Sequence, residues 1–281
     1  MLDFHPVKKS AEHTVSRRED GWPLHRFLST RLSLSRRKAK SLLDDRRVLV
    51  NSRRTWMARH LLRAGDRIRV NAPVTPSAKL KILWRDDSML VLDKPPGILS
   101  NGKDSLEALL RSDPEFSEWL AVHRLDRDTS GCLLFAASPL DKERVVKQFR
   151  ANTIRKVYQA IVLGRIPTPR ASVKTPLEEK KTVTRFEVLD ANRTASHIRI
   201  DLQTGRTHQI RKHVAELDHP VIGDKTYNAG ARIDRAYEGV PRQMLHARSI
   251  GFRESKSNKE MRVTAPLPAD FRRTLRLLRL T

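Results

Sequence analysis

The stretch HRLDRDTSGCLLFAA, residues 123–137, decides the predicted fold. It joins a polar segment of alternating arginine and aspartate, residues 123–130, to an apolar run that begins at Gly131. A short apolar run of this kind is typical of a buried strand, and a loop that leads into such a strand places polar groups at the floor of a cleft. The run therefore predicts a central strand, and we expect Cys132, the single cysteine, to be a core residue rather than a metal ligand or disulfide partner.

Strand-like and helical patterns continue on both sides of this run. Apolar or alternating patterns predict further strands at Lys81–Trp84, Met89–Asp93, Lys156–Leu163, Thr184–Leu189 and His197–Leu202. Two helices are predicted, one opened by the capping box Ser138-Pro139-Leu140-Asp141 and reaching about Phe149, and one marked by Ile210, Val214 and Leu217. Because these elements do not alternate regularly, we expect an α+β fold over residues 80–281, with a mainly antiparallel mixed sheet and flanking helices.

The polar segment also carries a family resemblance. Residues 123–131 match the HRLDxxTSG signature of the large pseudouridine synthase family that modifies ribosomal and transfer RNA. Other segments resemble that family's further elements in the same order: LDKPPG at 92–97, KVYQAIVLG at 156–164, TGRTHQIR at 204–211, then His219-Pro220, Gly223-Asp224, Tyr227, Leu245-His246-Ala247 and Ala265–Pro268. The resemblance spans about residues 80–271 and implies an enzyme that isomerises uridine to pseudouridine in structured RNA.

The resemblance also implies roles for single residues. Asp126 would be the catalytic carboxylate, Arg211 its basic partner with Arg206 as the alternative, and Tyr158 would lie beside the uracil ring. The reaction breaks the bond from the ribose anomeric carbon to the base nitrogen, turns the base and joins the same carbon to a ring carbon. A carboxylate can attack the anomeric carbon or remove the neighbouring sugar proton, and the sequence leaves both routes open.

Three further residues around the signature have expected roles. Because the reacting bonds are inaccessible in a stacked helix, the target uridine must be flipped out or lie in a loop. We expect the flat cationic side chain of Arg124 to fill the resulting gap. His123 and His208 are interpreted as structural or hydrogen-bonding residues, since no spacing of His, Asp and Glu forms a convincing metal set. The sequence thus predicts neither a metal nor a cofactor.

The charge of the chain indicates a polyanionic partner. Lysine and arginine number 56 against 32 acidic residues, which gives a formal net charge of +24 and a sequence pI near 11.0. Residues 24–70 carry 14 of the basic side chains against three aspartates. Basic surface binds nucleic acid by releasing counterions from phosphates, so RNA is the favoured partner. The sequence has no apolar run long enough for a membrane span, and residues 1–13 do not resemble a signal peptide, so we expect a cytoplasmic monomer.

The basic segment has its own folding signals. Leu24, Phe27, Leu28 and Leu32 recur at helical spacing, Ser35 can cap a second helix to Leu43, and residues 47–51 and 67–70 are typical of short strands. The second helix and the residues after it carry the candidate RNA-binding cations Arg36, Arg37, Lys38, Lys40, Arg46 and Arg47. The segment resembles the small RNA-binding domain of ribosomal protein S-four. The predicted domains are a flexible tail (1–21), this basic domain (22–72), a linker (73–79) and a catalytic domain (80–281).

Two segments depart from the family pattern. Ser100-Asn101-Gly102 replaces the usual histidine after KPPG, and 229–242 resembles an insertion; both are expected in elements that touch RNA.

The favoured substrate is large-subunit ribosomal RNA, with transfer RNA as the alternative. The other functions are a non-catalytic RNA-binding or ribosome-assembly factor and a metal-dependent nuclease that uses Asp126 and Asp128.

Overall fold

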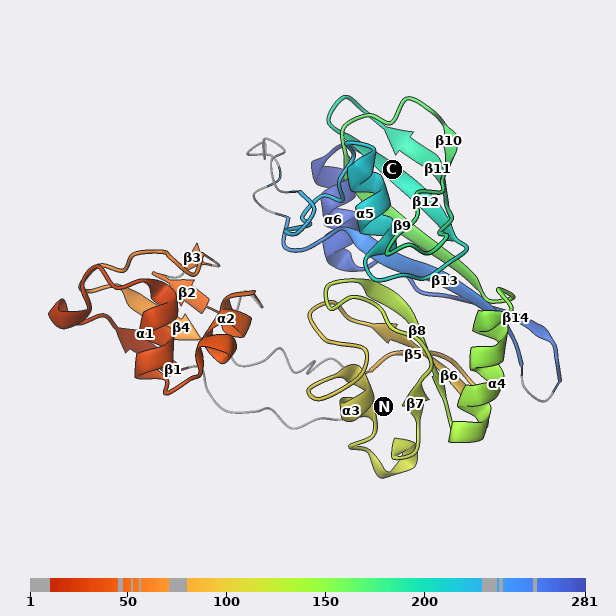
Figure 1. Cartoon of the computed structure of the whole chain (residues 1–281), viewed down its shortest axis with the longest axis horizontal. Helices are drawn as coiled ribbons and strands as arrows, with labels where there is room; N and C mark the ends of the chain where they lie inside the picture. The colour runs from red at the N-terminus through yellow and green to blue at the C-terminus, as the bar shows by residue number, and fades with distance from the viewer. Residues whose placement is uncertain are drawn as a thin grey trace. The chain divides into compact units, whose positions relative to one another are not determined.

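The chain divides into two compact units, Met1–Lys79 and Leu80–Thr281 (Figure 1). The computed structural model describes residues 11–44, 48–51, 53–55, 57–70, 80–228, 237, 240–254 and 257–281. The predicted linker at 73–79 and the cations Arg46 and Arg47 lie outside the described residues. Among the described residues, no helix is long and apolar enough to cross a membrane.

The first unit packs two helices against a small sheet. Its elements are β1 Ala11–Thr14, η1 Arg17–Glu19, α1 Leu24–Arg31, α2 Arg36–Asp44, β2 Val48–Val50, β3 Arg53–Arg54 and β4 Arg67–Val70. The four strands pair antiparallel in the order β1-β4-β2-β3. The Ser35 hydroxyl accepts a hydrogen bond from the backbone N–H of Lys38 at 3.2 Å, so the predicted cap of α2 is confirmed. Phe27, Leu43 and Ile68 are fully buried in the common core.

The flexible tail predicted for residues 1–21 is contradicted from residue 11 onward. β1 pairs with the open edge of β4, and Val15 is buried in the core of the unit. The Glu19 carboxylate accepts a hydrogen bond from Arg31 Nε at 2.6 Å, and this bond lowers the pKa of Glu19 to about 2. Backbone pairing and one ion pair therefore order a segment whose balanced charge gave no local sign of a strand. Residues 1–10 lie outside the described residues.

The second unit is built on one large mixed sheet. Its strands are β5 Ile82–Arg85, β6 Met89–Lys94, β7 Leu120–Ala121, β8 Ser130–Ala136, β9 Arg155–Leu163, β10 Arg170–Val173, β11 Thr184–Ala191, β12 Ala195–Leu202, β13 Leu245–Arg253 and β14 Glu260–Thr264. The sheet has the order β10-β11-β12-β9-β13-β8-β6-β5, with β14 beside β13 and β7 beside β8. The β13–β8 pair is parallel and the other strand pairs are antiparallel. The predicted α+β class with a mainly antiparallel mixed sheet is confirmed.

β8 is the central strand that the apolar run predicts. All seven of its residues are buried, including Cys132, and it lies between β6 and β13. Gly131 has a φ of +109°, and a Cβ atom at this position would overlap the carbonyl oxygen of Ala247. Only glycine allows β13 to approach β8 this closely. This close pairing places Ser130 and Gly131, at the end of the HRLDxxTSG signature, beside His246 and Ala247.

Helices cover parts of this sheet. They are α3 Leu106–Leu110, η2 Pro114–Phe116, α4 Pro139–Arg150, α5 Gln209–Glu216 and α6 Ala269–Leu277. The Ser138 hydroxyl accepts a hydrogen bond from Asp141 N at 3.1 Å, which confirms the predicted start of α4. α5 buries Ile210 and Val214 as expected, but Leu217 follows the helix end and is exposed, so its assignment to the apolar face is wrong.

Candidate active site

A cavity of about 120 Å³ opens at the signature loop, which we define as residues 123–130. Its walls come from the signature loop, β9, the end of β12, the turn before α5 and the start of β13. The lining side chains include the five candidate active-site residues that the sequence singles out: Arg124, Asp126, Tyr158, Arg206 and Arg211. Segments far apart in the sequence therefore meet at one hollow.

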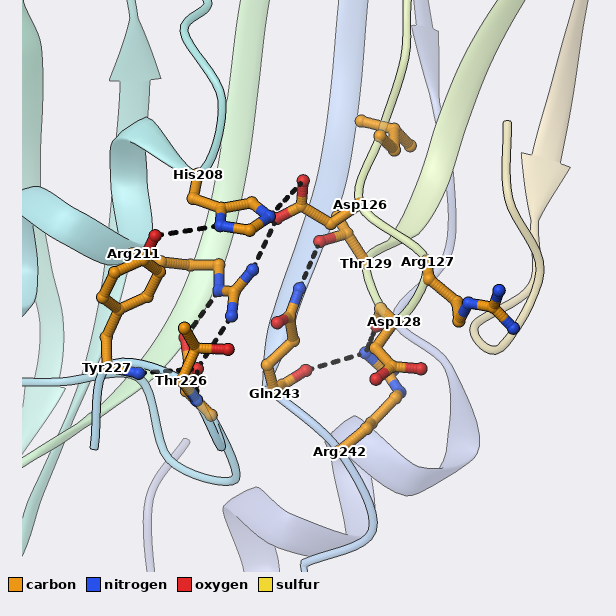
Figure 2. A network of polar contacts seen from close by, with 12 residues as sticks. Asp126, Arg127, Asp128, Thr129, His208, Arg211, Thr226, Tyr227, Arg242 and Gln243 are labelled. Atoms are coloured by element: carbon orange, nitrogen blue, oxygen red, sulfur yellow. Dashed lines mark hydrogen bonds and ion pairs between the residues drawn. The ribbon is translucent and has the colours of Figure 1, made fainter. Parts of the chain in front are cut away.

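Asp126 is held by Arg211. An Nη1 atom of Arg211 donates to Asp126 Oδ2 at 3.1 Å, and the Arg211 side chain is only 6% exposed, against 20% for Asp126 (Figure 2). A guanidinium that donates to a carboxylate forms a charge-assisted hydrogen bond, which fixes the orientation of the carboxylate. Of the two arginines considered, Arg211 is the one that contacts Asp126. Arg206 is exposed at the cavity wall, where its backbone N–H donates to Gln209 Oε1.

Arg211 is itself fixed by Asp224, a residue of the third family element for which the sequence predicted no role. Arg211 Nε and Nη2 donate to the two Asp224 carboxylate oxygens at 2.5 Å and 2.8 Å, and Asp224 also accepts from the backbone N–H groups of Thr226 and Tyr227. Burial raises the pKa of Asp224, but the hydrogen bonds and charge of Arg211 outweigh burial and hold this pKa below its ordinary value. The bidentate pair thus fixes the orientation of the guanidinium that faces Asp126.

His208 and Tyr227 form a second polar contact beside Asp126. His208 has a left-handed φ of 56° at the start of α5, and its Nδ1 lies 3.0 Å from the Tyr227 hydroxyl. Its Nε2 lies 3.7 Å from Asp126 Oδ1, and burial lowers its pKa. His123 accepts a hydrogen bond from Leu134 N at 3.1 Å, and burial lowers its pKa to about 4. Both histidines therefore make the hydrogen bonds expected of them.

Tyr158 lies in the wall of the same cavity. It is 8% exposed, on β9. Burial raises the pKa of its hydroxyl, and the negative charge of Asp126 raises it further. The phenol therefore stays neutral over the physiological range and can present an aromatic face and a hydrogen-bonding hydroxyl to a bound base.

The signature loop is held by buried polar groups of the Lys94–Ser100 segment. Lys94 is fully buried, and its ammonium donates to the carbonyl oxygens of Pro95 and Arg127, both at 2.9 Å. Burial lowers the pKa of Lys94 to about 7. The Ser100 hydroxyl accepts from Leu125 N at 2.8 Å and donates to Leu125 O at 3.0 Å. The expectation that Ser100 touches RNA is wrong, because its side chain is buried against the loop.

Cation ligands do not cluster in the described part of the chain. There, no group of three His, Cys, Asp or Glu side chains could hold a metal ion. Asp128, which the nuclease hypothesis pairs with Asp126, is not among the residues that line the cavity.

Comparisons with known proteins agree with this arrangement. A family model described as RNA pseudouridylate synthase matches residues 88–216. The chain is 34% identical over 276 aligned residues to ribosomal large subunit pseudouridine synthase C of Vibrio cholerae, covering 85% of this chain and 87% of the relative. It is 32% identical to ribosomal large subunit pseudouridine synthase D of Vibrio parahaemolyticus, covering 84% of each protein. The solved structure of human RNA pseudouridylate synthase domain containing 1 matches with a TM-score of 0.58 at 26% identity, over 72% of this chain and 96% of that one.

The chain therefore belongs to the RNA pseudouridylate synthase family. A further solved structure, human RNA pseudouridylate synthase domain containing 4, shares the fold with a TM-score of 0.62, covering 71% of this chain and 93% of that one at 22% identity. The protein is an RNA pseudouridine synthase, an isomerase that converts uridine in RNA to pseudouridine.

A buried histidine on β13, His246, is expected to make the stability of the second unit dependent on pH. His246 is fully buried, its Nδ1 lies 2.9 Å from Ser130 Oγ, and burial lowers its pKa from 6.5 to about 4. Its contribution to stability is complete above pH 6.5 and is lost as the pH falls toward 4. At pH 5 the loss should be about 2 kcal/mol.

Urea unfolding at pH 7.5 and pH 5 of the wild-type protein and of His246→Gln measures this contribution. Glutamine can hydrogen-bond but does not titrate, so the wild-type protein should lose about 2 kcal/mol more than the variant. Because His123 titrates in both proteins, it cancels in the comparison. Equal losses would contradict the assignment of the pH dependence to His246.

Proposed function

We propose that this enzyme isomerises specific uridines in structured large-subunit ribosomal RNA and that Asp126 is its catalytic carboxylate. The carrying observation is the contact of Asp126 with the buried Arg211 in a cavity that Tyr158 also lines. The names of the relatives from both Vibrio species, which are large-subunit ribosomal synthases, support the choice of RNA.

The chemistry of the reaction fits these groups. The bond from the ribose anomeric carbon to uracil N1 breaks, the base turns, and the same sugar carbon bonds to uracil C5, which loses its hydrogen as a proton while N1 gains one. No electrons are exchanged with an outside group. Asp126, oriented by its hydrogen bond from Arg211, either attacks the anomeric carbon or removes the adjacent sugar proton. Tyr158 then retains the detached uracil by contact with its ring.

The target uridine reaches the cavity by leaving its stack. Arg124 is exposed and lines the cavity two residues before Asp126. Its planar guanidinium can take the place of the displaced base, because arginine stacks on aromatic rings and pairs with phosphate. Arg206, also exposed at this wall, is suited to contact the RNA backbone.

The first unit serves as a small RNA-binding domain of the ribosomal protein S-four type. α2 buries Ala39 and Leu42 and exposes Arg36, Arg37, Lys38 and Lys40 to solvent. An exposed row of cations on a helix attracts the RNA phosphates and gives binding a strong dependence on salt.

Removing three of these cations should weaken RNA binding and reduce its dependence on salt. In the triple variant Arg36→Gln, Arg37→Gln, Lys40→Gln, the slope of log K against log salt should fall by about two, since each phosphate contact contributes about 0.7 to 0.9. Filter binding to a large-subunit ribosomal RNA transcript between 50 and 300 mM KCl measures the slope.

A variant with the same loss of charge on another helix is the control for the cation experiment. Arg272, Arg273 and Arg276 are exposed on α6, and their replacement by glutamine should change the slope by much less than one. Equal changes in both triple variants would show that total charge, rather than the α2 face, governs binding.

Mapping pseudouridine in cellular RNA tests the proposed function. Deleting the gene should leave one or more uridines of the large-subunit ribosomal RNA unmodified, and the wild-type gene should restore them while the Asp126→Asn gene does not. A loss confined to transfer RNA would overturn the proposed substrate. Restoration by the Asp126→Asn gene would overturn the proposed role of Asp126.

A further inference from the structure

A second buried guanidinium lies under the signature loop. Arg242 is only 4% exposed and lies just before β13, at the end of the 229–242 segment. This segment was predicted to touch RNA, and for the buried Arg242 the prediction is wrong. Figure 2 shows the Arg242 side chain beside Asp128.

Arg242 joins the signature loop to the C-terminal helix α6. Its Nε and Nη2 donate to the two carboxylate oxygens of Asp270 at 2.7 Å and 2.9 Å. Its Nη1 donates to the backbone carbonyl oxygen of Asp128 at 2.9 Å, and Nη2 also donates to Ser130 Oγ at 3.2 Å. This set uses the planar fork of arginine, which a lysine ammonium cannot reproduce.

The next residue holds the other side of the same turn. Gln243 Nε2 donates to Thr129 Oγ1 at 2.8 Å, and Thr129 N donates to the carbonyl oxygen of Asp126 at 3.0 Å. Gln243 and Thr129 are both buried, so water does not compete for these bonds. Arg242 and Gln243 therefore hydrogen-bond to the backbone and the side chains of the segment that follows Asp126.

The backbone of Arg242 also packs closely against the segment that carries Asp224. Gly223 has a φ of +79°, and a Cβ atom at this position would overlap the carbonyl oxygen of Arg242. The Arg211–Asp224 pair orients the Asp126 carboxylate directly, and the Arg242–Asp270 pair fixes the backbone from which it extends. Asp126 is thus located by two ion pairs, each with a buried arginine, whose segments share one close backbone contact.

We infer that Arg242, together with Asp270 and Gln243, positions Asp126 for catalysis; this inference rests on the proposed catalytic role of Asp126. None of the three side chains lines the cavity, so each acts through the signature loop and not on the RNA. A carboxylate that must attack or deprotonate a sugar has to be placed within about 0.5 Å, and a displacement of about 1 Å can cost a hundredfold in rate.

The test separates the chemical step from RNA binding. The variants are Arg242→Lys, Asp270→Asn and Gln243→Met, which approximately preserve side-chain size. The release of tritium from RNA that carries it at uracil C5 is followed in a single turnover at saturating enzyme, and RNA affinity is measured by filter binding. The first two variants should slow the chemical step by about 10 to 100-fold, and Gln243→Met by about tenfold, with RNA affinity within about twofold of wild type.

Leu278→Ala is the matched control for general loss of stability. Leu278 is buried just beyond the end of α6 and contacts no residue of the signature loop through a hydrogen bond. This variant should lower the thermal midpoint as much as Asp270→Asn does, yet keep the wild-type single-turnover rate. If Arg242→Lys or Asp270→Asn does not fold, Gln243→Met, which leaves both ion pairs in place, carries the test.

The outcomes distinguish this inference from the proposed function. Inactive Asp126→Asn together with wild-type rates in the Arg242, Asp270 and Gln243 variants would overturn the positioning role alone. A rate loss in Leu278→Ala equal to that in Asp270→Asn would overturn it as well, since stability would then account for both. An active Asp126→Asn enzyme would overturn the proposed function and the basis of this inference with it.

Discussion

The Asp126→Asn variant is expected to form pseudouridine at least about a thousandfold more slowly than the wild-type enzyme at saturating RNA. The amide has nearly the shape of the carboxylate and can still accept a hydrogen bond from Arg211. It is a far weaker nucleophile and base than a carboxylate, so both possible routes are blocked. Tritium release from uracil C5 measures the rate, and filter binding should show an RNA affinity close to that of the wild-type enzyme.

Asp128→Asn is the control for this experiment. Asp128 lies two residues further along the same loop, but it is not part of the cavity lining and contacts Arg242 through its backbone carbonyl. Its replacement should cost less than about tenfold, because the atom that accepts from Arg242 remains. Equal losses in the two variants would contradict a special role of Asp126. Magnesium-dependent RNA cleavage by the Asp126→Asn protein would instead support the nuclease hypothesis.

The sequence was sufficient to predict the central strand and the residues that gather at the cavity. Asp126, Tyr158 and Arg211 lie in separate motifs, and each motif ends or begins at a predicted strand or helix. The motifs are local patterns, so they can be recognised without knowing which strands pair. The parallel contact of β8 with β13, which the glycine at position 131 permits, then brings distant segments together, and no local pattern predicted this pairing.

The supporting residues could not be predicted in the same way. Ser100, Arg242 and Asp270 act on backbone atoms or side chains that are 25 or more residues away in the chain. In the sequence, Ser100 and Arg242 look like ordinary polar residues of segments that depart from the family pattern, which is why they were expected to touch RNA. Their role depends on burial, and burial of a polar side chain is decided by tertiary packing rather than by local pattern.

The Arg211–Asp224 and Arg242–Asp270 pairs differ in how exposed the remaining carboxylate is when the arginine is removed. Asp270 is partly exposed, at 28%, so water can solvate it without Arg242. The Asp224 side chain is fully buried and has no such relief. Breaking a buried pair by removing one charge is strongly destabilising, because the remaining charge is uncompensated. The largest effect on stability is therefore expected at Arg211.

Arg211→Met should lower the free energy of unfolding by about 3 to 5 kcal/mol at pH 7.5 and should lower the catalytic rate by at least about a hundredfold. Methionine fills much of the volume of arginine, so the loss reflects the missing charge and hydrogen bonds. Urea unfolding measures the stability. Arg206→Met is the control for stability, because Arg206 is exposed and its replacement should change the unfolding free energy by less than about 0.5 kcal/mol.

The pH dependence of the Arg211→Met variant tests the cause of that loss. In the wild-type protein Arg211 holds the pKa of Asp224 below its ordinary value, so this pair stabilises the fold above about pH 4 and its contribution is lost only below that. Without Arg211, only the backbone N–H groups of Thr226 and Tyr227 oppose the effect of burial, which is the largest influence on Asp224, and we expect burial to raise the pKa of Asp224 above the unfolded value. The variant should then gain stability relative to the wild-type protein as the pH falls from 7.5 toward 5, since protonation removes the buried charge. A stability difference that stays constant over this range would show that lost packing, and not an unpaired Asp224, destabilises the variant.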